Sequence, residues 1–189
     1  MKQKFEQKNL FCLPWAQTIL GTHYQGKVNF MALDWLTRVN VTPAMLGICV
    51  NRNHASCEAI AATGEFSVNL PSADMMAKTD YTGLVSAKRV DKSNLFQVFY
   101  GDLAAAPMIE ECPLTLECKL YQEVALPSHA FFIAEIINIF TEDRYLTDGK
   151  PDAAKIKPFV LTMPDNRYWA LGECIGKAWQ EGKVLKQGD

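Results

Sequence analysis

The stretch Leu114–Tyr121, with the sequence LTLECKLY, decides the fold class because its apolar and polar side chains alternate. Successive side chains of a strand point to opposite faces, so this pattern predicts a strand with one buried face. A second long strand is predicted from about Ala130 to Thr141, after the short connection Leu126–Pro127–Ser128. Two long antiparallel strands joined in this way indicate a barrel wall rather than a βαβ repeat.

The elements outward from this pair are shorter. Further strands are predicted over Thr18–Tyr24, Val28–Phe30, Met45–Val50, Glu65–Leu70 and Phe159–Met163. Helices are predicted from an N-cap at Ser56 to a stop at Gly64, from about Ser72 to about Tyr81, and over Glu173–Glu181. We therefore expect residues 1–189 to form a single, mainly β domain: a closed antiparallel sheet of six or seven strands with a few short helices.

Composition narrows the class of protein. The chain has 189 residues, of which 49% are hydrophobic, and 19 basic against 21 acidic side chains. This excludes a disordered chain, and the lack of a basic excess argues against a nucleic-acid partner. The apolar stretch Leu10–Leu13 is interrupted at once by Pro14, and Ala130–Phe140 is too short to span a bilayer. We expect a cytoplasmic protein with a small ligand and no membrane partner.

The six cysteines include no Cys-x-x-Cys pair, so we expect no metal site. Most of them are expected to be core residues in a reducing compartment. Cys57 is the exception, because it follows Ser56 at a predicted helix N-terminus, where a thiol pKa can be lowered. A catalytic thiol at Cys57 is therefore one hypothesis to test.

Three side chains suited to a phosphate, Arg52, His54 and Ser56, lie between a predicted buried strand and a helix. A helix N-terminus presents free N–H donors and the positive end of the helix dipole. The alternative is that Ser56 only caps the helix and that the other two are solvated. The segment Gly83–Lys92 adds three cations, and its alternative interpretation is an ordinary exposed basic loop.

The stretch Asn29–Trp35 mixes small, polar and aromatic residues where the N-terminal hairpin is expected to end. Its backbone N–H groups would be free to meet a flat polar ligand. The alternative for Trp35 is a core aromatic.

Taken together, these motifs resemble those of the flavin reductase-like, FMN-binding split-barrel family. The resemblance rests on Asn29-x-Met31–Ala32-x-x-Trp35, Pro43, Asn51-x-x-His54-x-Ser56, Gly64–Glu65–Phe66-x-Val68–Asn69–Leu70–Pro71, Gly83-x-x-Ser86, Asp91–Lys92 and Tyr168-x-x-Leu171–Gly172–Glu173-x-Ile175–Gly176. It covers about Pro14 to Lys183 and implies a split β-barrel with bound FMN.

The resemblance also implies roles for individual residues. The loop from Asn29 to Trp35 would line the flavin ring, with backbone groups of Met31, Ala32 and Leu33 at its polar edge. Asn51, Arg52, His54 and Ser56 would hold the ribityl chain and the phosphate, Lys92 would close over the phosphate, and Asn69 would lie nearby. His129 and Tyr168 would approach the flavin from the second subunit of a homodimer. Ser56 stands where relatives often have Thr, and it keeps the hydroxyl.

The implied function is an FMN-dependent oxidoreductase that moves electrons between NADH or NADPH, or a redox partner, and an acceptor. The alternative is a flavin-binding electron carrier with no NAD(P)H turnover of its own. The chain has no Gly-x-Gly-x-x-Gly fingerprint, so a nicotinamide would bind transiently. Because a flavin carries the redox chemistry, no dedicated catalytic acid, base or nucleophile is expected.

Overall fold

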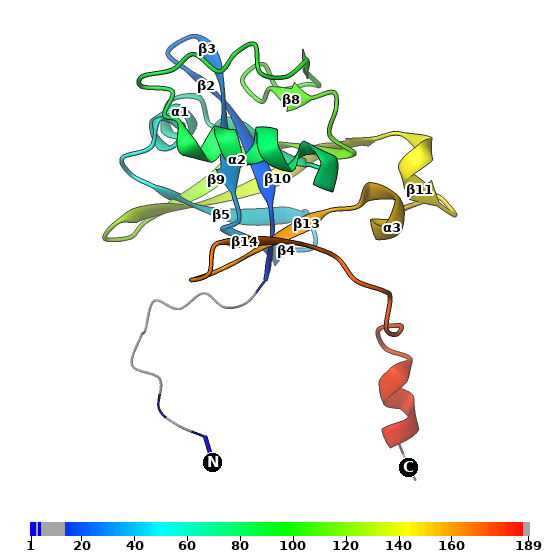
Figure 1. The fold of residues 1–189 in the computed structure, drawn as a ribbon. Helices are drawn as coiled ribbons and strands as arrows, with labels where there is room; N and C mark the ends of the chain where they lie inside the picture. Colours follow the sequence, from blue (N-terminus) through cyan, green and yellow to red (C-terminus); the bar gives the residue numbers. More distant parts are fainter. Residues whose placement is uncertain (3, 5–13, 187–189) are drawn as a thin grey trace.

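The computed structural model describes residues 1, 2, 4 and 14–186 (Figure 1). Its strands are β1 Trp15–Ala16, β2 Thr18–Tyr24, β3 Lys27–Leu33, β4 Leu36–Asn40, β5 Met45–Asn51, β6 Glu65–Leu70, β7 Val98–Phe99, β8 Met108–Ile109, β9 Leu114–Ala125, β10 His129–Thr141, β11 Leu146–Thr147, β12 Lys150–Pro151, β13 Phe159–Thr162 and β14 Arg167–Ala170. Its helical elements are α1 Ala55–Thr63, α2 Met76–Leu84 and α3 Ala153–Ile156, with 3₁₀ turns η1 Ala73–Met75, η2 Asp143–Tyr145 and η3 Glu181–Leu185.

The main sheet has seven strands in the order β3-β2-β6-β9-β10-β5-β4, and each neighbouring pair for which a register is seen is antiparallel. The mainly β class and the strand number are as the sequence predicts. The sheet is not closed by hydrogen bonds, however, because β3 and β4 are its two edges. Only two residues separate β3 from β4. A two-residue connection therefore links the two edge strands, β3 and β4. It stands in place of the hydrogen bonds between these strands that a closed sheet would need.

The long β9–β10 pair is confirmed as the wall of the sheet. Its register runs from Ala130 opposite Ala125 to Thr141 opposite Leu114, with two irregularities along β10. The expected single buried face is wrong, however, because Thr115 and Glu117 of the predicted polar face are buried, whereas Leu114, Leu116 and Leu120 are only half-buried. The buried face encloses a core that includes Phe66, Phe132 and Ile48.

Strand β3 continues to Leu33, so the stretch expected to be a loop from Asn29 is a strand for most of its length. Its residues pair with β2 from Lys27 opposite Tyr24 to Leu33 opposite Thr18. This ladder explains the correction, since pairing with β2 satisfies backbone groups that a loop would leave free. Helix α2 packs on β3 and crosses the front of the strands in Figure 1.

Helix α1 ends as predicted at Gly64, whose φ of 68° is left-handed and whose N–H donates to the Ile60 carbonyl. Its start differs from the prediction, because the N-cap is His54 and no side chain caps the helix. The turn preceding it begins early, where the His54 N–H donates to the Asn51 carbonyl. Ser56 consequently lies inside the first turn and is not the N-cap.

The second predicted helix is confirmed as η1 followed by α2, which runs through Gly83 to Leu84. The third, over Glu173–Glu181, is wrong. Strand β14, which the sequence analysis missed, pairs with β13 instead, and the chain after it is exposed from Leu171 to Lys186. A short helix needs tertiary packing to be stable, and none is available there.

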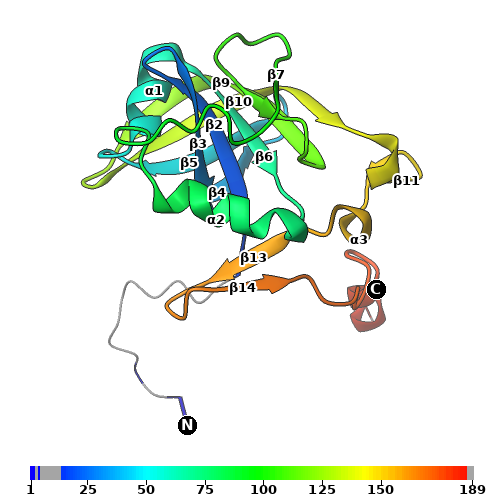
Figure 2. The ribbon, with the colours of Figure 1, turned by 45° about the horizontal axis from the view of Figure 1, so that its top comes forward.

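A smaller sheet, β1-β13-β14, is separate from the main one. Figure 2 shows β13 and β14 as a ribbon below α2, with the C-terminal segment leaving from its end. Among the described residues, no helix is long and apolar enough to cross a membrane.

Candidate functional site

A cavity of about 140 Å³ opens between the start of α1 and the end of α2; we call it the helix-end cavity. It brings together residues that are far apart in sequence. It is lined by Asn29, Met31, His54, Ala55, Ser56, Thr82, Gly83, Leu84, Val85, Ser86, Ala87 and Lys92. Five of the residues predicted from sequence thus meet here: Asn29, Met31, His54, Ser56 and Lys92.

The N-terminus of α1 forms one wall of this cavity. Of its first N–H groups, that of Cys57 donates to the His54 carbonyl at 3.0 Å, and no side chain caps the helix. The Ser56 Oγ accepts a hydrogen bond from the Asn29 Nδ2 at 2.9 Å, and the same amide nitrogen donates to the Thr22 Oγ1 at 3.1 Å. An uncapped helix N-terminus with an adjacent hydroxyl suits an anion.

The Asn29 side chain is 2% exposed, and its Oδ1 atom is buried without a hydrogen-bond partner. A buried acceptor that is left unsatisfied costs about 1–3 kcal/mol. A ligand that brings a hydroxyl or N–H donor to this oxygen would remove that cost. The atom therefore indicates what kind of group the cavity fits.

Lys92 is 4% exposed and lies at the opposite wall. Its Nζ donates to the Val85 carbonyl at 3.1 Å, to the Thr82 carbonyl at 3.3 Å, and to the Phe30 carbonyl. These bonds tie the C-terminal end of α2 to the edge strand β3. Burial lowers the pKa of Lys92 to about 8. Lys92 is thus a buried cation that holds the cavity wall together.

The cavity also has a positive electrostatic environment. The pKa of His54 is lowered by burial first, and then by the charges of His129, Lys92 and Lys88. Lys88 itself forms an ion pair with Glu58 of α1. The cations surrounding His54 would favour a negatively charged ligand in this cavity.

A second cavity, of about 200 Å³, lies beside Trp35; we call it the tryptophan cavity. It is lined by Trp15, Asp34, Trp35, Leu36, Thr37, Gly47, Cys49 and Phe131. The Trp35 ring stacks on the His129 ring with a centroid distance of 4.6 Å and an interplanar angle of 5°. Trp35 lines the tryptophan cavity, and His129 stacks on it without lining either cavity.

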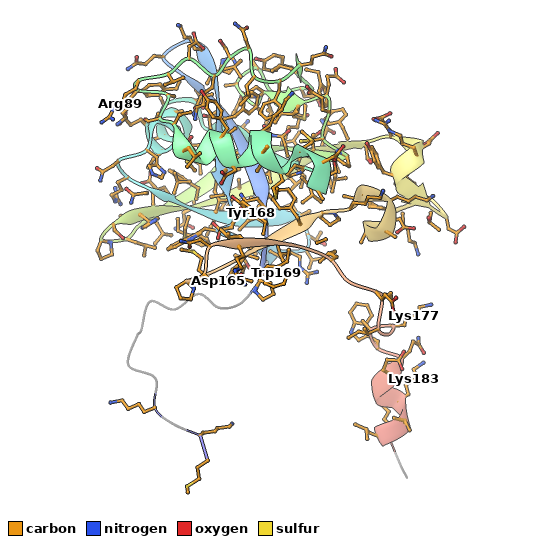
Figure 3. The ribbon with its side chains drawn as sticks, viewed as in Figure 1. Arg89, Asp165, Tyr168, Trp169, Lys177 and Lys183 are labelled. Atoms are coloured by element: carbon orange, nitrogen blue, oxygen red, sulfur yellow. The ribbon has the colours of Figure 1, made fainter. Side chains whose placement is uncertain are left out.

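Tyr168 lies on β14, and its hydroxyl donates to the Asp80 Oδ1 of α2 at 2.8 Å. Figure 3 shows Tyr168 on the side of β14 that faces α2, with Trp169 on the other side. Burial raises the pKa of Tyr168, and the bond to Asp80 raises it further. Tyr168 therefore anchors β14 to α2 in this chain, and it does not line the helix-end cavity.

The structure places the other predicted residues outside both cavities. The Asn51 Oδ1 accepts from the Asn53 N–H at 3.0 Å, and the Arg52 Nε donates to the Leu126 carbonyl at 3.1 Å. Asn69 is fully buried and donates to the Ile19 carbonyl and the Ser67 Oγ, while its Oδ1 accepts from the Ile109 N–H at 2.9 Å.

Leu33 and Ala32, which were expected at the polar edge of the flavin ring, also make contacts that stabilise the fold. Leu33 is a core residue whose carbonyl accepts from the Thr18 Oγ1 at 2.5 Å. Ala32 faces α2, because a Cβ built on Gly83 would lie 3.2 Å from the Ala32 Cβ. A side chain at position 83 would therefore crowd Ala32 of β3.

The sequence analysis did not identify the backbone at the end of α2 as part of the site. Residues 82–87 form one wall of the helix-end cavity, yet most of them carry no side chain with obvious chemistry. The motif Gly83-x-x-Ser86 was the available signal. The cations of Gly83–Lys92 also point to this segment, but not to its backbone.

Cys57 shows no sign of activation. The side chain is buried, and burial raises the pKa of its thiol, with a further rise from the Glu123 charge. Cys12, a further residue expected to be in the core, lies outside the described residues. Among those described, no cluster of His, Cys, Asp and Glu side chains could hold a metal ion.

We therefore expect Cys57 to react slowly with iodoacetamide near neutral pH, because little of its thiol is ionised or accessible. The exposed Cys174 provides an internal control. Mass spectrometry of the alkylated peptides should find Cys174 labelled well before Cys57. Faster labelling of Cys57 than of Cys174 would restore the thiol hypothesis.

Comparison with known proteins agrees with this architecture. A family model described as flavin reductase like domain matches residues 10–157. The crystal structure of flavoredoxin from Methanosarcina acetivorans is 49% identical, covers 98% of this chain and 100% of its own, and superimposes with a TM-score of 0.96.

Two further structures are more distant. The flavoredoxin of Desulfovibrio vulgaris (Miyazaki F) is 27% identical, with 96% of this chain and 100% of that one covered and a TM-score of 0.88. An FMN-binding protein from Thermus thermophilus shares the fold at 16% identity, with 94% and 98% coverage and a TM-score of 0.80. The resemblance found in the sequence motifs is thereby confirmed, and the chain belongs to the flavin reductase-like domain family.

Proposed function

We propose that this chain binds FMN, with the phosphate at the helix-end cavity. The observation that carries the proposal is the convergence there of an uncapped helix N-terminus, a buried lysine and an unsatisfied amide oxygen. The first two suit a phosphate, while the Asn29 Oδ1 suits a hydroxyl donor such as those of a ribityl chain. The residues present therefore fit the group.

Within this proposal, the Ser56 hydroxyl and the first N–H groups of α1 hold the phosphate, and Asn29 accepts from the ribityl chain. Met31 lines the helix-end cavity, and Trp35, stacked on His129, lines the tryptophan cavity. These side chains would exclude water from the flavin ring. Arg52, Asn51 and Asn69 are assigned supporting roles, because their side chains bind other parts of the protein.

We further propose an FMN-dependent oxidoreductase that passes electrons between NADH or NADPH, or a redox partner, and an acceptor. Bound FMN supplies the one- and two-electron chemistry, and the protein supplies binding, orientation and electrostatics. Membership of the flavin reductase-like family supports this reaction class. We also propose a homodimer that works in a reducing compartment such as the cytoplasm. The free cysteines support the choice of compartment.

The test of turnover is an anaerobic mixture of the FMN-loaded protein with NADH or NADPH. Rapid bleaching of the flavin absorbance, followed by repeated turnover when acceptor is added, is expected for the oxidoreductase. If neither nicotinamide bleaches the flavin but a reduced redox protein does, the chain is an electron carrier instead.

The affinity for FMN should fall as pH rises above 7. A bound phosphate favours the ammonium form of Lys92, so binding raises its pKa above the value of about 8 in the free protein. Binding then takes up a proton, and the dissociation constant should rise roughly tenfold between about pH 7 and pH 9.5 for each unit of pKa increase. Below this window Lys92 is protonated in both states, so a further change in affinity there would come from protonation of the FMN phosphate, whose second pKa is about 6.

Fluorescence titrations with FMN across this pH range measure the effect. Lys92→Arg is the matched variant, because arginine stays charged throughout. The variant should show a flat profile. An equal slope in the two proteins would show that Lys92 does not couple to the phosphate.

A further inference from the structure

The amide group of Asn29 is held from two sides inside the protein. Asn29 lies on β3 directly opposite Thr22 of β2, and its Nδ2 donates to the Thr22 Oγ1 at 3.1 Å and to the Ser56 Oγ at 2.9 Å. All three side chains are at most 2% exposed. An amide nitrogen carries two N–H donors, so these two bonds use its donor capacity completely. The network therefore turns the amide oxygen away from both hydroxyls.

The direction of these bonds leaves one acceptor and one donor for a ligand. Among the described residues, nothing donates to the buried Asn29 Oδ1, and Asn29 lines the helix-end cavity. The Ser56 Oγ, at the same cavity, accepts from Asn29, so its own proton remains to be donated. A ligand that satisfies both groups carries a donor close to an acceptor. A phosphate monoester with hydroxyl groups on its carbon chain has that combination.

Thr22 differs from the other two residues because it does not line the cavity. It is fully buried on β2, against which α1 packs. Without its hydroxyl, one N–H of Asn29 would lose its acceptor, and orphaned buried N–H groups are rarer in proteins than under-satisfied carbonyl oxygens. The amide would then gain by rotating, so that its oxygen accepts from Ser56 and its nitrogen points to the cavity. A hydroxyl donor on the ligand would lose its acceptor.

We propose that Thr22 is a positioning residue that makes the helix-end cavity select polyol phosphates. It holds the Asn29 oxygen towards the cavity, where this oxygen accepts from a hydroxyl of the chain that carries the phosphate. The proposal rests on the proposed binding of FMN, whose ribityl phosphate belongs to this class. It adds the residue through which the cavity recognises hydroxyl groups as well as the phosphate.

The experiment compares two flavin phosphates by fluorescence titration of the full-length protein. One is FMN, and the other is an analogue whose pentyl chain keeps the terminal phosphate but has no hydroxyl groups. The wild-type protein should bind FMN about tenfold more tightly than the analogue. Thr22→Val should weaken FMN binding about tenfold and leave the binding of the analogue unchanged, because only FMN uses the Asn29 oxygen.

Two control variants separate positioning from loss of structure. Thr22→Ser keeps the hydroxyl and should restore the wild-type preference for FMN. Thr115→Val makes the same substitution at a buried threonine of β9 that lines neither cavity, and it should bind both ligands as the wild type does. A cavity that is merely loosened would bind both ligands more weakly, so the ratio of the two dissociation constants is the decisive quantity.

Failure of this inference and failure of the proposed function give different results. A wild-type protein that binds neither flavin phosphate would overturn the proposed function and the inference with it. A wild-type protein that binds both equally would show that the cavity recognises no hydroxyl group, and would overturn the inference alone. The same holds if the wild type prefers FMN and Thr22→Val keeps that preference or loses affinity for both ligands equally.

Discussion

Replacing Lys92 by methionine is expected to destabilise the protein by about 2–4 kcal/mol and to weaken FMN binding at least tenfold. The Lys92 ammonium donates to the carbonyls of Phe30, Thr82 and Val85. Methionine fits the volume but donates nothing, so three carbonyls lose a charged partner. The relief of burying a charge offsets only part of this loss. Since these bonds join α2 to β3, the wall of the helix-end cavity should loosen as well.

Urea unfolding of the apoprotein and FMN titration measure the two effects. Lys119→Met is the matched control, because Lys119 lies on the exposed face of β9 and should change neither quantity by more than about 0.5 kcal/mol. A Lys92→Met protein with the stability and FMN affinity of the control would contradict the assigned role.

Placing a negative charge at the mouth of the helix-end cavity should also have a large effect. Ser86 lines the cavity and is exposed, so Ser86→Glu can be accommodated without burying the new carboxylate. Repulsion between this carboxylate and a phosphate should weaken FMN binding about 10- to 100-fold, which corresponds to about 1.4–2.8 kcal/mol.

Ser86→Gln separates charge from size and should bind FMN almost as the wild type does. The loss in Ser86→Glu should shrink as salt concentration rises, because the charge is solvent-exposed. Riboflavin, which has no phosphate, should bind the two variants equally. Equal FMN affinities of Ser86→Glu and Ser86→Gln would place the phosphate elsewhere.

The parts of the fold that were predicted correctly are those encoded locally. The strand predicted over Leu114–Tyr121 is confirmed as part of β9, although its predicted polar face is partly buried, at Thr115 and Glu117. Gly64 stops α1 because a left-handed residue is required there. Whether the sheet is closed, by contrast, depends on whether the edge strands β3 and β4 pair with each other, and no local sequence pattern indicates this.

For the site, the sequence predicted which residues lie at the cavity better than it predicted their hydrogen-bond partners. His54, Ser56, Asn29, Met31 and Lys92 do meet at one cavity. Arg52 looks equally suited to a phosphate, but its guanidinium binds the Leu126 carbonyl of the β9–β10 connection. Such competition between a ligand and a distant backbone carbonyl becomes visible only in three dimensions.

The role of Lys92 also becomes visible only in three dimensions. Its charge is evident in the sequence, whereas the three carbonyls that surround it come from β3, from α2 and from the residue after α2. The helix predicted over Glu173–Glu181 rests on the flanking Gly172 and Gly182, which mark possible ends but do not show whether a surface is present for a helix to pack on.

The central claim is that the helix-end cavity holds the phosphate of FMN. It is tested most directly by mixing the purified protein with FMN or with riboflavin, desalting, and recording the visible absorption spectrum. The account predicts that FMN is retained at roughly one per chain while riboflavin is lost. A protein that retains both flavins equally, or that is colourless after desalting from FMN, would contradict it.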